Sequence, residues 1–121
     1  MDLQPPNAKL LLDLMSASVM RAKVLGNNVA NQNVPGYIRQ DVLFESKLSR
    51  ALARGKKTED LRDLDPEIVE DHETPKRADG NNVVVEEELS LSKENRLLFE
   101  LYGTILRGQS GLIRTAITGR R

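Results

Sequence analysis

The chain contains no cysteine and no tryptophan, and histidine occurs only once. The absence of cysteine excludes disulfide scaffolds, thiolate zinc sites, iron–sulfur clusters and cysteine nucleophiles. Aromatic residues make up 3% of the 121 residues, so few bulky side chains are available to anchor a hydrophobic core. Lysine plus arginine, 18, equals aspartate plus glutamate, 18. The chain therefore has no overall basic field that would attract nucleic acid or anionic lipid.

The chain also lacks the segments that insert into membranes or direct secretion with cleavage. No apolar run approaches the roughly 18–20 residues that span a bilayer, so we expect no direct membrane insertion. Residues 1–6 carry no basic region followed by an apolar stretch. We therefore expect no cleaved signal peptide.

Residues that could carry catalysis or hold a metal are few and poorly arranged. The single histidine, His72, lies between Asp71 and Glu73; three adjacent coil residues do not converge on one ion, so His72 is interpreted as a solvated loop residue. Glu86–Glu88 point about 100° apart on a helix, which favours a role in complementing the helix dipole over paired carboxylates. Gly108–Gly111 lies inside a helical period, unlike a phosphate-binding loop. We expect no catalytic, cofactor-binding or metal-binding residues and no enzyme activity.

Two long segments have the apolar spacing of helices that pack against a partner helix. In residues 7–33, apolar and small residues recur at alternating intervals of three and four. This helix should end before Val34-Pro35-Gly36, because the residue preceding a proline is disfavoured in a helix. A second such pattern runs from residue 86 to about 116. Three glycines inside it suggest a close backbone approach or a bend: Gly103, Gly108 and Gly111.

The segment from 39 to 79 is dense in charge. A short helical pattern runs from Val42 to Leu52. The remaining residues have too few apolar side chains to offset an ordering cost of roughly 1–2 kcal/mol per residue, so we expect them to be extended or conditionally ordered. Asp79-Gly80-Asn81-Asn82 predicts a turn, and Val83-Val84-Val85 after it predicts a short β segment.

These patterns predict a mainly α fold. Two long terminal helices pair as an antiparallel coiled coil, and an extended, partly disordered or β-containing middle segment loops out between them. We divide the chain into an N-terminal coiled-coil helix (1–34), the middle segment (35–85) and a C-terminal coiled-coil helix (86–121), which together form one domain. A two-helix hairpin leaves a flank of each helix exposed, and small scaffolds of this kind usually need oligomerisation. The expected interface residues are Leu11, Leu14, Ser18, Leu25 and Val29 on the first helix, and Leu98, Leu101, Ile105, Leu112 and Ile113 on the second.

The polar block at the end of the first helix is the most specific motif in the chain. Its amides can cap the helix and fix the turn, or form a hydrogen-bonded ladder between subunits. The run Asn28-Val29-Ala30-Asn31-Gln32-Asn33-Val34-Pro35-Gly36-Tyr37 resembles the Asn-Ile/Val/Leu-Ala-Asn-x-x-Thr-Pro-Gly-Tyr signature of flagellar rod and hook proteins. Val34 departs from the usual threonine. The motif residues are Asn28, Ala30, Asn31, Pro35, Gly36 and Tyr37.

Two further stretches narrow the resemblance within that group. Asp41-Val42-Leu43-Phe44-Glu45 and Asp79-Gly80-Asn81-Asn82-Val83 look like stretches of the proximal rod branch of the flagellar basal-body rod protein family. Val84 stands where that branch often has an acid. The residues of this second motif are Asp79, Gly80, Asn81 and Val83.

The resemblance implies a structural subunit of the bacterial flagellar basal-body rod. Such a subunit polymerises through its terminal helices, transmits torque across the periplasm and surrounds the export channel. It would be exported through the type III apparatus without a cleaved signal peptide, and would use no cofactor. Its implied partners are further copies of itself, FlgC-like and other axial rod subunits, a FliE-like adaptor at the membrane ring, and the export apparatus. Asn28, Asn31, Pro35, Gly36 and Tyr37 would set the helix-to-loop bend that positions the middle segment on the outer wall.

Two other classes of protein remain compatible with the sequence. A soluble α-hairpin adaptor or export chaperone would form a stable, discrete oligomer at micromolar concentration. A small enzyme would need a cavity with convergent titratable groups, which the sequence does not indicate.

Overall fold

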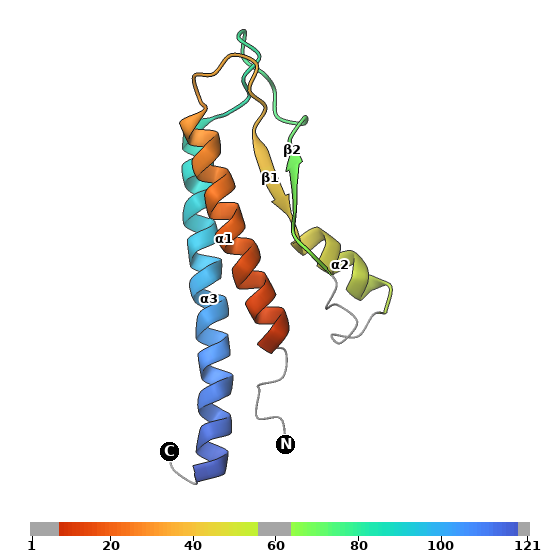
Figure 1. Cartoon of the computed structure of the whole chain (residues 1–121), viewed down its shortest axis with the longest axis vertical. Helices are drawn as coiled ribbons and strands as arrows, with labels where there is room; N and C mark the ends of the chain where they lie inside the picture. The colour runs from red at the N-terminus through yellow and green to blue at the C-terminus, as the bar shows by residue number, and fades with distance from the viewer. Residues whose placement is uncertain (1–7, 56–63, 119–121) are drawn as a thin grey trace.

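A computed structural model describes residues 8–55 and 64–118 of the chain (Figure 1). In chain order the elements are helix α1 (Ala8–Ala30), strand β1 (Gln40–Leu43), helix α2 (Glu45–Ala53), strand β2 (Glu67–Glu70) and helix α3 (Val85–Thr118). Residues 1–7, which include the first residue of the helical pattern predicted from residue 7, lie outside the described residues. So do residues 56–63 of the charge-dense segment and residues 119–121.

The two long helices lie side by side and run in opposite directions (Figure 1). α1 has 23 residues and α3 has 34. Contacts at three levels fix the antiparallel register: Asn28 bonds to Glu88, Asn95 bonds to the carbonyl of Ser18, and a Cβ on Gly103 would lie 3.6 Å from Met15. The prediction of a mainly α fold with paired antiparallel terminal helices and a β-containing middle segment is confirmed.

The middle segment is more regular than the sequence predicted. β1 and β2 form an antiparallel two-stranded sheet with Val42 opposite Ile68, and β1 packs beside α1. The prediction of helix from Val42 onward was therefore wrong for its first residues, since α2 begins only at Glu45. A local helical pattern does not reveal strand pairing with residues 24 to 30 positions away.

The predicted β segment at Val83–Val85 is also wrong. Residues 81–84 have no regular structure, and Val85 is already the first residue of α3. The backbone N–H of Glu88 donates to the carbonyl oxygen of Val84 at 3.0 Å, which is a helical hydrogen bond. No strand lies beside this valine run among the described residues, so its β propensity gives way to the helix that follows.

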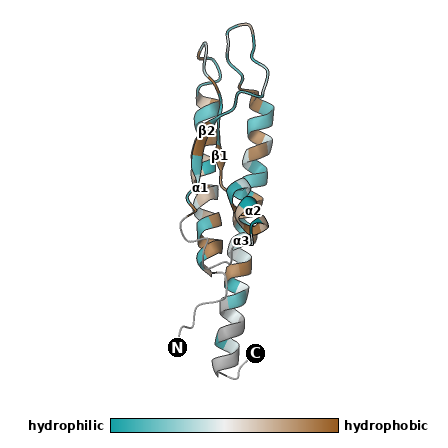
Figure 2. Ribbon diagram, turned by 90° about the vertical axis from the view of Figure 1, so that its right-hand side faces the viewer, coloured by the Kyte–Doolittle hydropathy of each residue, from teal (hydrophilic) through white to brown (hydrophobic). Residues whose placement is uncertain are grey.

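The hydrophobic core is thin and lies where α1, α3 and the β1–α2 corner meet. Leu14, Ala17 and Phe44 form its buried centre, and Tyr102 of α3 packs against them. Along both long helices, hydrophobic and hydrophilic residues alternate (Figure 2). Each helix therefore buries only part of its apolar surface within the chain.

One of the two sequence interpretations, that the glycines of α3 bring another backbone close, is not supported by the structure. Gly103 lies against the side chain of Met15, whereas a Cβ on Gly108 or Gly111 would meet nothing within 4 Å among the described residues. A Cβ at Gly103 would make an ordinary van der Waals contact with Met15, so the spacing of α1 and α3 at this level does not require glycine.

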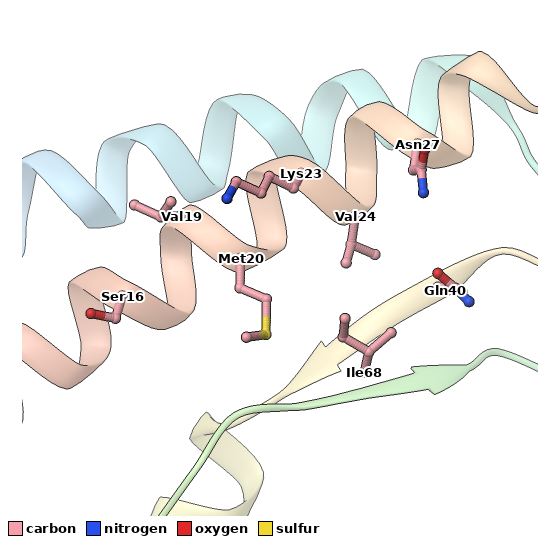
Figure 3. A pocket seen from close by; sticks show the side chains of 8 residues that line it. All are labelled: Ser16, Val19, Met20, Lys23, Val24, Asn27, Gln40 and Ile68. Carbon is pink, nitrogen blue, oxygen red and sulfur yellow. The ribbon is translucent and has the colours of Figure 1, made fainter.

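The sheet stands off from α1 and leaves a surface groove between them (Figure 3). Met20 and Val24 of α1 point into this groove, and Ile68 of β2 faces them from the opposite wall (Figure 3). Ile68 is about half exposed, so the groove is open to solvent, and polar side chains such as Lys23 and Gln40 also line it.

Candidate functional site

The two sequence motifs, which lie more than 40 residues apart, meet at one end of the helix pair. The backbone N–H of Gly36 donates to the carbonyl oxygen of Asp79 at 2.8 Å, and a Cβ on Gly80 would lie 3.3 Å from the Cα of Gly36. Both glycines have positive φ, 75° and 84°, a conformation that other residues rarely adopt. We call this region, with Arg39 and Glu88 beside it, the motif junction.

Asn81 ties the end of α1 to the start of α3. Its Nδ2 donates to the carbonyl oxygens of Asn31 and Val34, both at 2.9 Å, and its Oδ1 accepts from the backbone N–H of Val83 at 2.7 Å. Asn81 and Val83 are fully buried. One amide side chain thus satisfies backbone groups that follow α1 and precede α3.

Asn28, which is also fully buried, acts as a strand partner for β1. The backbone N–H of Gln40 donates to Asn28 Oδ1 at 2.9 Å, and Asn28 Nδ2 donates back to the Gln40 carbonyl oxygen at 2.8 Å. The same amide accepts from the Tyr37 hydroxyl at 3.0 Å and donates to Glu88 Oε2 at 3.0 Å. A single side chain therefore connects α1, the turn, the sheet and α3.

Arg39 lies at the centre of the motif junction, where it is buried with Glu88 and Asn82 and bonds to the partly buried Asp71. Its Nε donates to Glu88 Oε1 at 2.5 Å and its Nη1 to Asp71 Oδ2 at 2.8 Å. Its backbone N–H donates to Asn82 Oδ1 at 2.6 Å. Burial lowers the pKa of Arg39, but the hydrogen bonds to Glu88 and Asp71 and the negative charges of Glu88 and Asp41 outweigh it and raise the pKa. The guanidinium is therefore charged at every physiological pH, and it needs both carboxylates.

Asp71 gives the motif junction an acid-sensitive contact. A hydrogen bond from the Thr74 hydroxyl, at 2.6 Å, and then the bond from Arg39 hold the pKa of Asp71 well below its usual value of 3.8. A carboxyl group with a lowered native pKa contributes stability above its unfolded pKa, and this contribution disappears as the pH falls through the native pKa.

We therefore expect the chain to lose stability as the pH is lowered below about 4. The Asp71→Asn variant should be less stable at pH 7 but should lose less on acidification. Urea unfolding at pH 7, 4 and 3, followed by circular dichroism, measures both slopes. Parallel pH dependence in the two proteins would contradict a native carboxylate at this position.

A second ion pair, outside the motifs, positions α2. Arg21 of α1 donates through both Nη atoms to Glu45, at 2.8 and 2.5 Å, and also to the carbonyl oxygen of Val42 at 3.1 Å. Partial burial opposes ionisation of Glu45, but the hydrogen bonds from Arg21 outweigh it and lower the pKa of Glu45. The pair fixes the corner between β1 and α2 against the first helix.

The described residues show no reactive centre. Within 8–55 and 64–118, no three histidine, aspartate or glutamate side chains are grouped so that they could hold a metal ion. His72 is exposed, with its Nε2 3.1 Å from Glu70 Oε2. Of the helices in this part of the chain, none is both long and apolar enough to cross a bilayer. The motif junction is a structural joint built of amides and one buried ion-pair cluster.

Comparison with known proteins points to one family. No protein-family model matches the chain. The FlgB flagellar basal body rod protein of Aquifex aeolicus is 30% identical over 103 residues, covering 83% of each chain. FlgB of Bacillus subtilis is 28% identical over 117 residues, covering 90% of this chain and 91% of the relative. FlgB of Salmonella typhimurium is 24% identical over 115 residues. The chain belongs to the FlgB family of flagellar basal body rod proteins.

Membership of the FlgB family confirms the resemblance drawn from the two motifs. A FlgB-family chain is a structural protein of the flagellar basal body and is not an enzyme. As a rod protein it associates with other components of the basal body. We therefore interpret the motif junction as part of the fold of a structural subunit.

The structure separates the predicted interface residues of this FlgB-family chain into two groups. On α1, Val29 is half-buried, and the other four residues are buried within the chain itself: Leu11, Leu14, Ser18 and Leu25. On α3, Leu98 is half-buried, whereas Leu101 and Ile105 are 51% and 40% exposed. The side chains of Leu112 and Ile113 lie outside what the structure describes. The exposed apolar surface of the pair thus lies mainly on α3.

The predicted turn residues are placed unevenly in the motif junction. Ala30, Pro35 and Gly36 are exposed at the turn, and Asn31 Nδ2 donates to the Asn27 carbonyl oxygen at 2.7 Å as a helix cap. Asn28 is buried, and both ends of its amide are bonded within the chain. Asn31 thus caps the helix, as one of the two interpretations of this polar block expects, whereas Asn28 bonds to β1 and to α3.

Sequence reasoning missed the residues that join the motifs: Arg39, Asp71, Asn82 and Glu88. Glu88 was assigned with Glu86 and Glu87 to the helix dipole, yet it is 1% exposed. Arg39 follows the Pro-Gly-Tyr turn by two residues, but nothing in the local sequence shows that it is buried. Its charge needed a partner, but nothing local identifies which of many acids supplies it.

Proposed function

We propose that this chain is a subunit of the proximal rod that polymerises through its two terminal helices. The observation that carries this proposal is the row of large aliphatic side chains on α3 that the chain leaves uncovered. Leu97, Leu101 and Ile105 are 67%, 51% and 40% exposed. Exposed apolar rows of this kind mark interaction surfaces, and the thin core described above gains from their burial between subunits.

The motif junction gives such a subunit the stiffness that torque transmission requires. Its hydrogen bonds tie both long helices and the sheet together at one end, through Asn28, Arg39 and Asn81. A load applied to the sheet would therefore reach the helices without passing through a flexible loop. In an array, helices packed in this way would line the export channel while the middle segment forms the outer wall.

We also propose how the chain is exported and which proteins it contacts in the rod. Two helices that complete their burial only on assembly suit passage through the type III export apparatus as an unfolded chain, without a cleaved signal peptide. The neighbours would be further copies, FlgC-like and other axial subunits, and a FliE-like adaptor at the membrane ring, within the periplasm.

Far-UV circular dichroism combined with sizing over a concentration series tests polymerisation directly. We expect helix content and particle size to rise together without a fixed end point, because each added subunit covers apolar surface of the last. A discrete, fully helical dimer or tetramer with no further growth would contradict the proposal and favour a soluble α-hairpin adaptor or export chaperone.

The turn at Gly36 is expected to matter for assembly more than for export. Gly36→Val places a β-branched residue at φ 75°, which costs about 1–2 kcal/mol and distorts the motif junction. Export handles an unfolded chain and should continue. The measurement compares the amount of protein exported with the amount recovered in isolated basal bodies.

Gly26→Val is the matched control for that experiment. A Cβ at Gly26 or at Gly36 meets nothing within 4 Å, but only Gly36 has a positive φ. The control should assemble normally, since valine and glycine differ little in helix propensity. Retention of the Gly36 variant in the cytoplasm would show that the turn acts in export instead.

A further inference from the structure

A second surface groove lies between α1 and α3, away from the sheet. Its volume is about 380 Å³. Val19 and Ala22 of α1 and Phe99 of α3 give it apolar walls, and the full lining is Ser18, Val19, Ala22, Ser92, Asn95, Arg96 and Phe99. Val19 and Phe99 are 46% and 37% exposed. The groove thus exposes apolar surface that a partner could cover.

Two buried polar atoms belonging to residues of this groove have no hydrogen-bond partner among the described residues: Ser18 Oγ and Asn95 Oδ1. Ser18 is 1% exposed and Asn95 is 5% exposed. The Nδ2 of Asn95 is used, since it donates to the Ser18 carbonyl oxygen at 2.8 Å. Leaving such a buried group unpaired costs about 1–3 kcal/mol. Both atoms are shielded from solvent in the single chain, so they lie beneath the surface of the groove and not in its open part. No such unpaired atom belongs to the described residues that line the groove beside the sheet (Figure 3).

The same chain carries a ridge of matching shape on the other side of α3. Leu97, Leu101 and Ile105 follow one another at intervals of four residues, which forms a straight ridge on a helix. At about 100° per residue, this ridge lies roughly 180° around α3 from the residues that line the groove. The ridge of one copy therefore cannot enter its own groove.

The dimensions of the ridge and the groove agree. From Leu97 to Ile105 the ridge rises about 12 Å at 1.5 Å per residue, and the α3 wall from Ser92 to Phe99 rises about 10 Å. Thr104, which lies beside Leu101 and Ile105 on this side of α3, brings a hydroxyl group. Its hydrogen is already donated to the Glu100 carbonyl oxygen at 2.8 Å, so towards the groove the hydroxyl oxygen can act only as an acceptor.

We propose that the groove of one copy receives the Leu97–Leu101–Ile105 ridge of the next copy. This inference rests on the proposed polymerisation and identifies the surfaces that carry it. Since groove and ridge lie on opposite sides of the helix pair, the contact is heterologous: every bound copy still offers one free groove or one free ridge. Heterologous contacts that do not close into a ring generate an open helical array.

The absence of cysteine allows a direct crosslinking test on the full-length purified chain. Ala22→Cys places a thiol in the groove, and Leu101→Cys places one at the middle of the ridge. When the two single variants are mixed and oxidised, we expect a disulfide between them. It should form about tenfold faster or more than in the control mixture of Ala22→Cys with Glu100→Cys, since docking raises the local thiol concentration. The Glu100 position lies about 100° away on the same helix.

The outcomes separate this contact from polymerisation itself. If the chain associates but the mixed disulfide does not exceed the control, the ridge-in-groove contact is wrong and the proposed function stands. If Ala22→Cys crosslinks efficiently to itself, the groove pairs with its own copy symmetrically, which also overturns the proposal. If the chain shows no growth at any concentration, the proposed polymerisation fails, and the contact fails with it.

Discussion

Replacing Glu88 by glutamine is expected to lower the free energy of unfolding by about 3 kcal/mol. Glu88 is 1% exposed and accepts from both Arg39 and Asn28. A glutamine amide keeps one acceptor oxygen but places a donor at its other atom, where Arg39 or Asn28 also donates. The buried guanidinium would retain Asp71 at 2.8 Å, with Asp41 farther away at 4.0 Å. Removing one member of a buried ion pair costs about 3–5 kcal/mol, and the remaining partner places the effect at the lower end of that range.

The change is large for a domain of this size. With an urea m-value of about 1–3 kcal/mol/M, it lowers the unfolding midpoint by about 1–3 M. Urea titration followed by circular dichroism gives the value.

Glu87→Gln is the matched control for Glu88→Gln. Glu87 lies one position earlier in the same first turn and is exposed. Both variants remove one negative charge from the helix N-terminus, an effect of about 0.3–1 kcal/mol. If the two variants were equally destabilised, Glu88 would act only on the helix dipole, and the structural role assigned to its pair with Arg39 would be wrong.

The long helices could be predicted because their signal is local and repeated. The apolar spacing in residues 7–33 and from 86 to about 116 gave helices whose ends agree with α1 and α3 within a few residues. Each turn of such a helix repeats the same evidence. The proline after Val34 marked the end of the first helix correctly to within four residues.

The sheet could not be predicted, because its evidence lies in two segments that are individually weak. β1 contains Val42 but is followed at once by a helix, and β2 reads Glu67-Ile68-Val69-Glu70 inside a charged stretch. The strands are held by each other and by α1, since Arg21 and Asn28 bond to the outer backbone groups of β1. Contacts between residues far apart in the sequence determine the structure of this region, and no short window of the sequence contains both partners.

The two motifs of the candidate site could be predicted from the sequence. The contacts between them could not, because they join residues far apart in the sequence, as in the sheet. The two motifs stood out by their asparagines and glycines, and their turn chemistry was correctly foreseen at Gly36 and Gly80. That the motifs contact each other was not foreseen. The buried cluster around Arg39 was also missed, because a charged residue in a charged chain carries no local sign of burial.

The largest effect is expected from Asn28→Asp, which changes one nitrogen to oxygen at the most connected side chain of the motif junction. The variant loses the donor to the Gln40 carbonyl oxygen and places a carboxylate about 3 Å from Glu88 Oε2, where Asn28 Nδ2 lies now at 3.0 Å. Two buried carboxylates so close cannot both ionise freely. We expect a loss of about 3 kcal/mol or more at pH 7.

This loss should shrink on acidification, which is the opposite of the trend expected from Asp71. Burial and Glu88 raise the native pKa of the introduced carboxyl above its unfolded value of about 3.9. Between those two values the native state holds a proton that the unfolded state has lost, so stability recovers as the pH falls. A protonated carboxyl also restores a donor towards Glu88. Asn27→Asp, which adds the same charge at an exposed neighbour, should show a small loss without this recovery. Equal losses at pH 7 and pH 5 in the Asn28 variant would show that the new carboxylate escapes to solvent, and that Asn28 does not bind Glu88 as the structure has it.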